Sequence, residues 1–534
     1  MSTNEATPLL GKLASDPGEH PLHGCAENEP PATQTGKRFA PWQIAVFFGI
    51  ILARADTSLV WATHETVASH FDNLDNSSWM MTSFAIGCCV TFPLYGRLSD
   101  DYGRLRPLIA AYVLFCIGCT LCGIGQSYWQ VILGRTLTGC GASGIVSLAS
   151  IIITDIAEPL DVAVSRSYVN IASILGISIG GPSFLGQVPI ATACCIIIAR
   201  GLQNFLLEAD RSKNSQMEEP QDERRKRLPS FDYLGAVTLA IWITSFLVII
   251  DLQVQLSWTH PLLLSLIIIG IISFLVFLIL ETYPGGRELL IPLSLFKTEV
   301  GAFCVGQLLL VGSCQGFVSQ IVPYFINTRG SSDAEAGWLI VPVSIGNAVG
   351  SLVAGRMIKR YGSYKRLSLA SLFLSIAISI VILVQWSYPM NALGSLTSFP
   401  FGLFAGMVTS AQFFGLYLCA PKQQMTTAIG IYYMSQQIGI AVGITIMSTL
   451  LNGQFEKTLQ YLLVDIPGFE KIIESILSDS SIVKELSEPV RSLVRQSYLS
   501  TFWIVPAIAI MAQAIAIWPL ASTTEKYSDP VRKS

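Results

Sequence analysis

Charge is scarce in this chain of 534 residues. Asp, Glu, Lys and Arg make up 13% of it, whereas soluble domains carry about 25%. Apolar residues make up 51%. So little charge cannot cover an aqueous surface, which excludes a single soluble core, and we expect the lipid bilayer to be the solvent. The formal net charge of −3 gives no reason to expect a nucleic-acid partner.

Several chemical signatures are missing as well. Of the twelve cysteines only Cys25 lies in a polar segment, so no disulfide framework is expected. His64-Glu65 begins like a zinc-protease helix, but Ala68 stands where the second His would be needed. No glycine-rich nucleotide loop followed by Lys occurs. We therefore expect no enzyme, no metal and no cofactor.

Long apolar runs are what the chain has in abundance. A helix that spans a bilayer needs about 20 apolar residues. Fourteen such runs follow one another in groups of six, two and six, near 42–62, 77–96, 107–125, 129–152, 166–185, 187–207, 232–252, 261–281, 301–325, 335–358, 367–386, 396–420, 426–451 and 499–521. The pattern predicts an all-α membrane protein with about 14 transmembrane helices.

These runs divide the chain into segments with different expected roles. We predict a disordered cytosolic tail (1–40), a six-span half (41–207), a charged cytosolic linker (208–231), two extra spans (232–281), five spans of a second half (282–451), a long outer loop (452–498), the last span (499–521) and a cytosolic tail (522–534).

The placement of Lys and Arg predicts the orientation. Basic residues gather in alternate loops, whereas the short loops between them hold only Arg329. Cytosolic loops carry the excess of positive charge, so both termini are expected in the cytosol. Asn76-Ser77-Ser78 is then a glycosylation acceptor at Asn76 on the outer side. Glu5-Ala6-Thr7-Pro8-Leu9-Leu10 resembles an acidic dileucine signal, so the plasma membrane and the vacuolar membrane both stay open.

A basic, glycine-bracketed hairpin occurs twice. Gly96-Arg97-Leu98-Ser99-Asp100-Asp101-Tyr102-Gly103-Arg104-Leu105-Arg106 returns in altered form at 355–366 as Gly-Arg-Met-Ile-Lys-Arg-Tyr-Gly-Ser-Tyr-Lys-Arg. Each copy lies between two apolar runs. A repeated tight turn indicates a duplicated bundle, and many secondary transporters place their site between two such halves.

The hairpin pattern Gly-x-Leu-x-Asp-x-x-Gly-Arg-x-Arg at 96–106 resembles the signature loop of the major facilitator superfamily. Asp56-Thr57 in the first span, and Arg135 followed by Gly139, Gly141 and Gly144, resemble the branch of drug:proton antiporters with fourteen spans. Fungal toxin exporters and vacuolar basic amino-acid transporters share that branch. The resemblance covers about 41–521 and implies a major-facilitator-type bundle of two six-helix halves with two extra central spans.

Two buried charges are the candidates for proton coupling. An ionisable residue inside a span is a functional candidate by default, and Asp56 lies in the first run. A carboxylate balanced between burial and a nearby cation can exchange a proton. Arg54 is a poor partner for Asp56, because residues two apart point to nearly opposite sides of a helix. Arg135 has no neutralising neighbour in sequence, and the resemblance implies a role in proton coupling for it. The other interpretation of Asp56 is a static carboxylate that accepts hydrogen bonds from a neighbouring helix, and that of Arg135 is a structural clamp on backbone carbonyls or a carboxylate.

The resemblance also implies a conformational latch in the first hairpin. Its residues are Gly96, Asp100, Gly103, Arg104 and Arg106. They would hold one conformation of the bundle through charged contacts with neighbouring helix ends, the alternative being charge that only sets topology.

The fifth span departs from the resembled pattern. Gly181-Pro182 is similar to the kink of the antiporter signature there, since Pro bends a helix. The glycines, outer loop and aromatic-Arg-Trp element expected next are absent, about fifteen residues in all. Either the gene model skips a segment here, or the fifth and sixth spans are shortened and kinked.

Polar side chains in otherwise apolar spans are the candidate substrate contacts: Gln307, Gln315, Gln436 and Gln437. The commoner role of such groups is bonding to a neighbouring helix.

The leading hypothesis is a secondary active transporter that exports a small organic molecule, such as a toxin, drug or secondary metabolite, in exchange for protons. A vacuolar basic amino-acid transporter is the close alternative. A membrane sensor or scaffold that transports nothing is the second.

Overall fold

The computed structural model describes residues 41–73, 76–179, 184–214, 232–253, 256–283, 289–331, 333–390, 392–463, 473, 476 and 488–525. Regular structure within these ranges is helical throughout, and fourteen helical segments are long and apolar enough to cross a membrane. The prediction of an all-α membrane protein with 14 spans is therefore confirmed. The tail 1–40, the kink residues Gly181 and Pro182, and residues 526–534 lie outside the described ranges.

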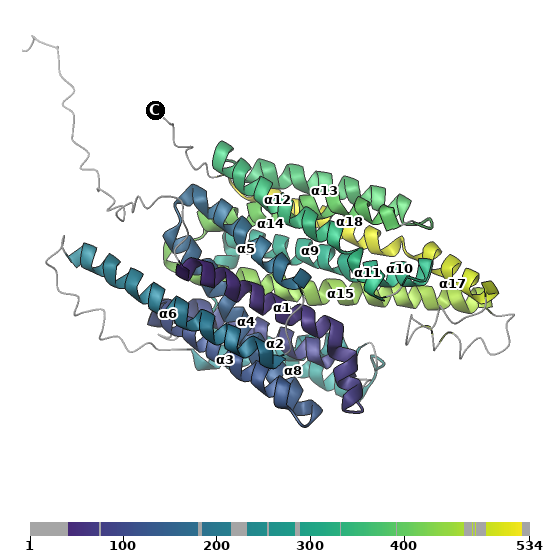
Figure 1. The fold of residues 1–534 in the computed structure, drawn as a ribbon, viewed down its shortest axis with the longest axis horizontal. Helices are drawn as coiled ribbons and strands as arrows, with labels where there is room; N and C mark the ends of the chain where they lie inside the picture. The colour runs from purple at the N-terminus through teal and green to yellow at the C-terminus, as the bar shows by residue number, and fades with distance from the viewer. Residues whose placement is uncertain are drawn as a thin grey trace, which may run out of the picture. The chain divides into compact units, whose positions relative to one another are not determined.

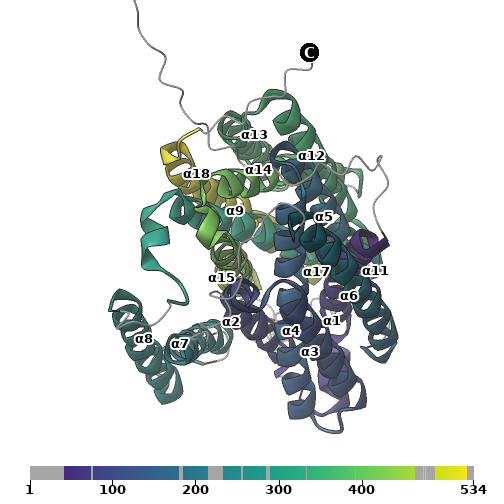
Figure 2. The ribbon, with the colours of Figure 1, turned by 90° about the vertical axis from the view of Figure 1, so that its left-hand side faces the viewer.

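The N-terminal half contains six helices (Figure 1). They are α1 (Pro41–His70), α2 (Trp79–Tyr102), α3 (Leu105–Ile124), α4 (Tyr128–Ile156), α5 (Pro159–Ile179) and α6 (Phe184–Asn214). Two further helices, α7 (Tyr233–Leu252) and α8 (Pro261–Thr282), pair with each other. Figure 2 shows this pair outside the two halves, where α7 contacts α2 and α15 (Met425–Leu463).

The C-terminal half has more breaks in its helices. Its elements are α9 (Glu299–Ser319), α10 (Ile321–Arg329), α11 (Asp333–Trp338), α12 (Val341–Tyr361), α13 (Lys365–Gln385), α14 (Ser398–Cys419), α15, α17 (Glu488–Thr501) and α18 (Ile504–Ser522). Short 3-10 turns at Leu293–Lys297, Ala392–Thr397 and Lys422–Gln424 precede α9, α14 and α15.

The packing repeats between the halves. In the first half α1 packs on α5 and α6, α2 packs on α4, and α3 packs on α4 and α6. In the second half α9 packs on α15 and α18, α12 packs on α14, and α13 packs on α14 and α18. The same neighbours recur in the same order, which is the duplicated six-helix architecture that the repeated hairpin predicts.

Glycines allow the close helix pairs of both halves. A Cβ on Gly141 of α4 would lie 2.4 Å from the backbone nitrogen of Phe115 in α3. A Cβ on Gly350 of α12 would lie 1.9 Å from the carbonyl oxygen of Leu403 in α14. Membrane helices associate by close packing of small residues, so these positions fix how near the helices come.

The fifth and sixth helices differ from the sequence prediction. The fifth helix begins at Pro159, seven residues before the predicted run, because only Ala157 and Glu158 separate it from α4. Helices α5 and α6 are 21 and 31 residues long, enough to cross a bilayer. The expectation of two shortened spans is therefore wrong. The charged residues of α5, which lowered its apparent hydropathy, lie inside the helix.

The predicted outer loop 452–498 is partly helical. Helix α15 continues to Leu463, and α17 begins at Glu488. Aromatic and aliphatic side chains of α10, α15 and α17 share one buried cluster there, with Phe455, Tyr498 and Tyr324 among its members. Helix α6 also continues to Asn214, into the segment predicted as linker.

Candidate functional site

A cavity of about 280 Å³ lies between the N-terminal half, α7 and α15. It reaches from the middle of α1, at Arg54, to Trp61 of the same helix and to Ser78 at the start of α2. We call the end of the bundle that holds the turns 96–106 and 355–366 the hairpin side. The cavity therefore extends toward the opposite side.

A second and smaller cavity, of about 80 Å³, lies between the two halves and is more polar. Its polar lining residues are Arg166, Asn170, Gln307, Gln315, Ser375, Asn347, Thr409, Gln436 and Gln513. Gln315 lines both cavities, so the two are neighbours within one interior space.

Asp56 of α1 and Arg135 of α4 form an ion pair beside the larger cavity. Arg135 Nη1 donates to Asp56 Oδ2 at 2.6 Å, and the two side chains are 1% and 0% exposed. Only Arg135 of the two lines the cavity. The second carboxylate oxygen of Asp56, Oδ1, is buried without a hydrogen-bond partner among the described residues.

The surroundings of Arg135 hold its guanidinium in place. The group lies over the Phe84 ring at 4.6 Å from the centroid, and Nε donates to the Met80 carbonyl at 3.5 Å. Both contacts come from α2. The sequence placed a charge on each of the two helices, but their pairing spans 79 positions and depends on the fold.

Arg54, two residues before Asp56, faces different surroundings. It lines the larger cavity, and its Nε is buried without a hydrogen-bond partner within the described part of the chain. A Cβ on Gly176 of α5 would lie 2.7 Å from Arg54 Cβ, so α5 packs directly against this position. Asp56 is thus paired with α4, whereas Arg54 lies between α5 and the larger cavity.

Arg166 of α5 is a charged group that the sequence analysis did not select. Its Nη1 donates to the hydroxyl of Tyr433 in α15, and its guanidinium lies 4.5 Å from the centroid of Phe413 in α14. The Tyr433 hydroxyl also bonds to that of Ser150 at 2.6 Å. One cation of the first half is therefore held by aromatic rings of the second. The signal in the sequence is an arginine at the first position of the predicted run 166–185.

The four candidate glutamines all line the interior space. Gln307, Gln315 and Gln436 line the smaller cavity, and Gln437 lines the larger one. Gln307 Oε1 accepts from the Tyr432 hydroxyl at 2.8 Å, whereas Gln436 Oε1 has no partner among the described residues. Their role as substrate contacts stays a prediction.

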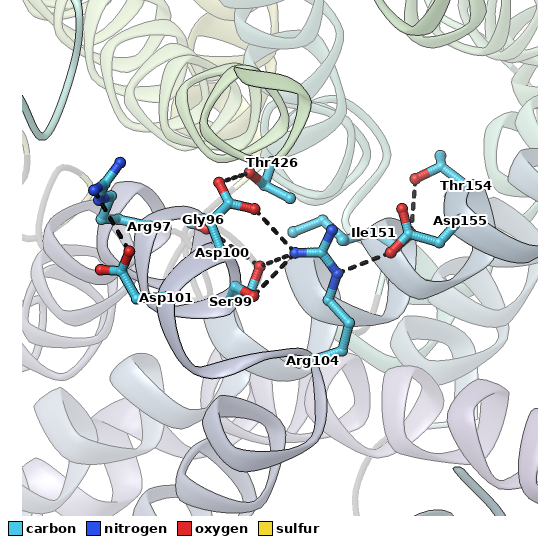
Figure 3. A network of polar contacts seen from close by, with 10 residues as sticks. All are labelled: Gly96, Arg97, Ser99, Asp100, Asp101, Arg104, Ile151, Thr154, Asp155 and Thr426. Carbon is cyan, nitrogen blue, oxygen red and sulfur yellow. Dashed lines mark hydrogen bonds and ion pairs between the residues drawn. The ribbon is translucent and has the colours of Figure 1, made fainter. Parts of the chain in front are cut away.

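The first hairpin carries a network of polar contacts (Figure 3). Arg104 Nε donates to Asp155 of α4 at 2.8 Å, and Arg104 Nη1 donates to Asp100 at 3.1 Å. Arg104 also donates to the carbonyl and hydroxyl of Ser99, at 3.1 and 2.8 Å. The Thr426 hydroxyl of α15 donates to the other oxygen of Asp100. Asp100 therefore connects the two halves, and Arg104 orients it.

Among the other latch candidates, the two glycines allow a backbone conformation or a close helix contact, and Arg106 is exposed. Gly103 has a φ of +78°, a conformation that favours glycine. A Cβ on Gly96 would lie 2.8 Å from the Thr426 carbonyl, so this glycine lets α2 approach α15. Arg106 is exposed.

The second hairpin also contacts the opposite half. Lys359 at the end of α12 pairs with Asp161 at the start of α5. Farther along the same helices, Asn170 Nδ2 donates to Asn347 Oδ1 at 2.7 Å. Helices α2 with α15 and α5 with α12 thus join the halves on the hairpin side, while the larger cavity extends the other way. This arrangement matches a bundle closed at the hairpin side.

The remaining candidates are peripheral. The Asn76 carbonyl accepts from the Tyr128 hydroxyl at 2.6 Å, and Ser78 of the same acceptor motif donates to Asp251 at 3.3 Å. The described cysteines form no disulfide bond, and no cluster of metal-ligating side chains occurs within the described ranges.

Comparison with known proteins gives consistent results. A family model described as Major Facilitator Superfamily matches residues 46–444. The chain is 26% identical over 479 residues to the vacuolar membrane amino acid uptake transporter fnx2 of Schizosaccharomyces pombe, covering 86% of this chain and 79% of that protein. It is 26% identical to the multidrug resistance protein fnx1 of the same organism, covering 89% and 91%. It is 26% identical to the vacuolar basic amino acid transporter 2 of Saccharomyces cerevisiae, covering 79% and 92%.

Solved structures show the same fold. The human organic anion transporter MFSD10 (TETRAN) superimposes with a TM-score of 0.54 at 14% identity, covering 89% of this chain and 100% of that one. A bacterial homologue of the human lysosomal transporter Spinster gives a TM-score of 0.50 at 15% identity, covering 91% and 98%.

Proposed function

Because the chain belongs to the major facilitator superfamily, whose members are membrane transporters, we propose that it exports a small organic molecule from the cytosol in exchange for protons. The observation that carries the proposal is the buried pair of Asp56 and Arg135 at the cavity wall. We assign Asp56 as the proton carrier and Arg135 as its partner.

The pair couples protonation to the arrangement of α1 and α4. Removing one charge of a buried ion pair costs about 3–5 kcal/mol, because the other charge is left uncompensated. Protonation of Asp56 from the side opposite the hairpins therefore frees Arg135 and weakens the contact between the two helices. Loss of the proton on the hairpin side restores the pair, so one cycle moves one proton inward.

The hairpin contacts hold the closed state during this cycle. Asp100 with Thr426 and Lys359 with Asp161 join the halves on the hairpin side. When these contacts break, the interior space opens to that side and a substrate can enter. We propose that the hairpin side faces the cytosol, because the excess of Lys and Arg lies there.

The direction of transport follows from the same orientation. Both termini face the cytosol, and the solute moves to the vacuolar lumen or the cell exterior. A vacuolar basic amino-acid transporter is the second candidate, and the similarity to the vacuolar basic amino acid transporter 2 of Saccharomyces cerevisiae supports it. The sensor alternative depended on shortened spans, and α5 and α6 have full length.

Reconstitution into vesicles that contain a pH-sensitive dye tests the proposal. Adding members of a panel of drugs, fungal metabolites, lysine and arginine should move protons for at least one compound. Asp56→Asn should abolish that movement, because an amide cannot carry the proton. Asp72→Asn is a matched control, since Asp72 is an exposed carboxylate outside the cavity. Proton movement that survives Asp56→Asn would contradict the assignment. Movement with lysine and arginine alone would support the vacuolar candidate.

A further inference from the structure

Two groups of opposite charge face the larger cavity without an ionic partner. Arg54 lines it from α1, and no described carboxylate pairs with it. Asp251 lines it from α7 and accepts only neutral hydroxyl donors, Ser78 Oγ at 3.3 Å and Thr82 Oγ1 at 3.1 Å. Neither forms an ion pair with any residue in the described ranges.

Unpaired charges within a membrane bundle call for an explanation. Ionisable residues in spans are costly and almost always pair with one another or line a path for a solute. Asp56 and Arg135, at the same cavity, follow the first pattern. Arg54 and Asp251 pair neither with each other nor with Asp56 and Arg135. We therefore infer that they line a path for a solute.

We propose that Arg54 and Asp251 are the two charged poles of a binding site for a small molecule that carries both a carboxylate and an ammonium group. Arg54 binds the carboxylate, and Asp251 binds the ammonium. Helix α7, one of the two extra spans, is thereby part of the substrate site and determines its specificity. The inference deepens the proposed function and rests on it.

The cavity favours such a zwitterion over singly charged compounds. A cation is attracted to Asp251 but repelled by Arg54, whereas an anion is attracted to Arg54 but repelled by Asp251. The wall around the poles is largely apolar, with Phe84, Ile177 and Ile250 among its residues, and accepts an apolar body. The volume of about 280 Å³ lies at the lower limit for pockets that hold drug-sized ligands, about 300–1,000 Å³. A small metabolite therefore fits the space.

Binding of matched derivatives to the full purified chain tests the inference. The probes are leucine, phenylalanine and lysine, each as the free amino acid, its methyl ester and its N-acetyl derivative. Esterification removes the carboxylate, and acetylation removes the α-ammonium. We expect at least one free amino acid to bind about ten- to a hundredfold more tightly than its two derivatives, the range for a hydrogen bond to a charged group.

Two substitutions should change this preference in different ways. Arg54→Gln should bind the free amino acid and its methyl ester equally well, but should still prefer the free amino acid to its N-acetyl derivative. Asp251→Asn should do the opposite. Arg54→Lys and Asp251→Glu keep the charges and should keep both preferences, which separates loss of a pole from misfolding. Asp72→Asn should change neither.

The outcomes also separate this inference from the proposed function. If none of the three amino acids binds, or if each binds no more tightly than its derivatives, the assignment of Arg54 and Asp251 as charged poles is wrong. If the dye-filled vesicles still show coupled flux of another compound, the exporter proposal survives that result. Amino acid binding with both preferences but no flux sensitive to Asp56 would support the poles and refute the coupling.

Discussion

Replacing Asp100 by Ala should open the hairpin side. The carboxylate is the acceptor for the Thr426 hydroxyl from the opposite half. Arg104 retains Asp155 at 2.8 Å after the substitution, so no guanidinium is stranded. The perturbation therefore removes a contact between the halves and leaves the rest of the network paired.

The magnitude follows from the exposure of the contact. The Asp100 side chain is 29% exposed, so water competes for it and the net value of the hydrogen bond is about 0.5–1.5 kcal/mol. Since RT is about 0.6 kcal/mol, the ratio of closed to open bundles should fall about two- to tenfold.

Hydrogen–deuterium exchange followed by mass spectrometry measures this shift toward the open bundle without an attached probe. In Asp100→Ala, exchange should rise in 426–433 of α15 and in 161–170 of α5, because both segments join the halves on the hairpin side. Asp101→Ala is the matched control, since Asp101 pairs with Arg97 of its own helix at 3.4 Å. Equal exchange in the two variants would refute the idea that Asp100 acts as a latch between halves.

Three other perturbations test packing, the link between the halves and orientation. Gly141→Ala should lower the melting temperature, because its Cβ would need about 1 Å more room against the backbone of α3, an overpacking cost of about 1–3 kcal/mol. Gly453→Ala is the control, because a Cβ there would meet nothing within 4 Å, and it should raise the melting temperature slightly. A melting temperature of Gly141→Ala equal to or above that of Gly453→Ala would contradict the packing argument. Tyr433→Phe should slow transport and lower the melting temperature, because it leaves the Arg166 donor without its hydroxyl acceptor at a cost of about 1–3 kcal/mol; unchanged flux and melting temperature would refute a role for this link. Treatment with a glycosidase should shift the mobility of the wild type and not of Asn76→Gln, and a wild type without a shift would count against an outer location of that turn.

The number of spans and their grouping could be predicted from the sequence, because the length of apolar runs reflects bilayer thickness. The repeated hairpin likewise predicted two halves that the packing confirms. The start of α5 could not be predicted this way. Asp161 and Arg166 reduce the hydropathy of its first turns, yet Asp161 pairs with Lys359, and Arg166 is buried against rings of α14 and α15.

Contacts between residues far apart in the chain could not be predicted from the sequence either. Asp56 and Arg135 were each candidates, but only the contact of α1 with α4 brings the carboxylate and guanidinium to 2.6 Å. Arg54 and Asp251 are 197 positions apart and meet at one cavity because α7 packs on α2. A local pattern contains no information about such neighbours.

The position of the α7–α8 pair has a consequence for the moving parts. Helix α7 contacts α2 of one half and α15 of the other, so it cannot follow both when they rotate apart. Asp251 accepts hydrogen bonds from Thr82 of α2 and from Ser78, the residue before that helix. The α15 residues at the same cavity include Gln437, Ile440 and Ile444. We therefore expect the α7–α8 pair to travel with the first half when the two halves separate.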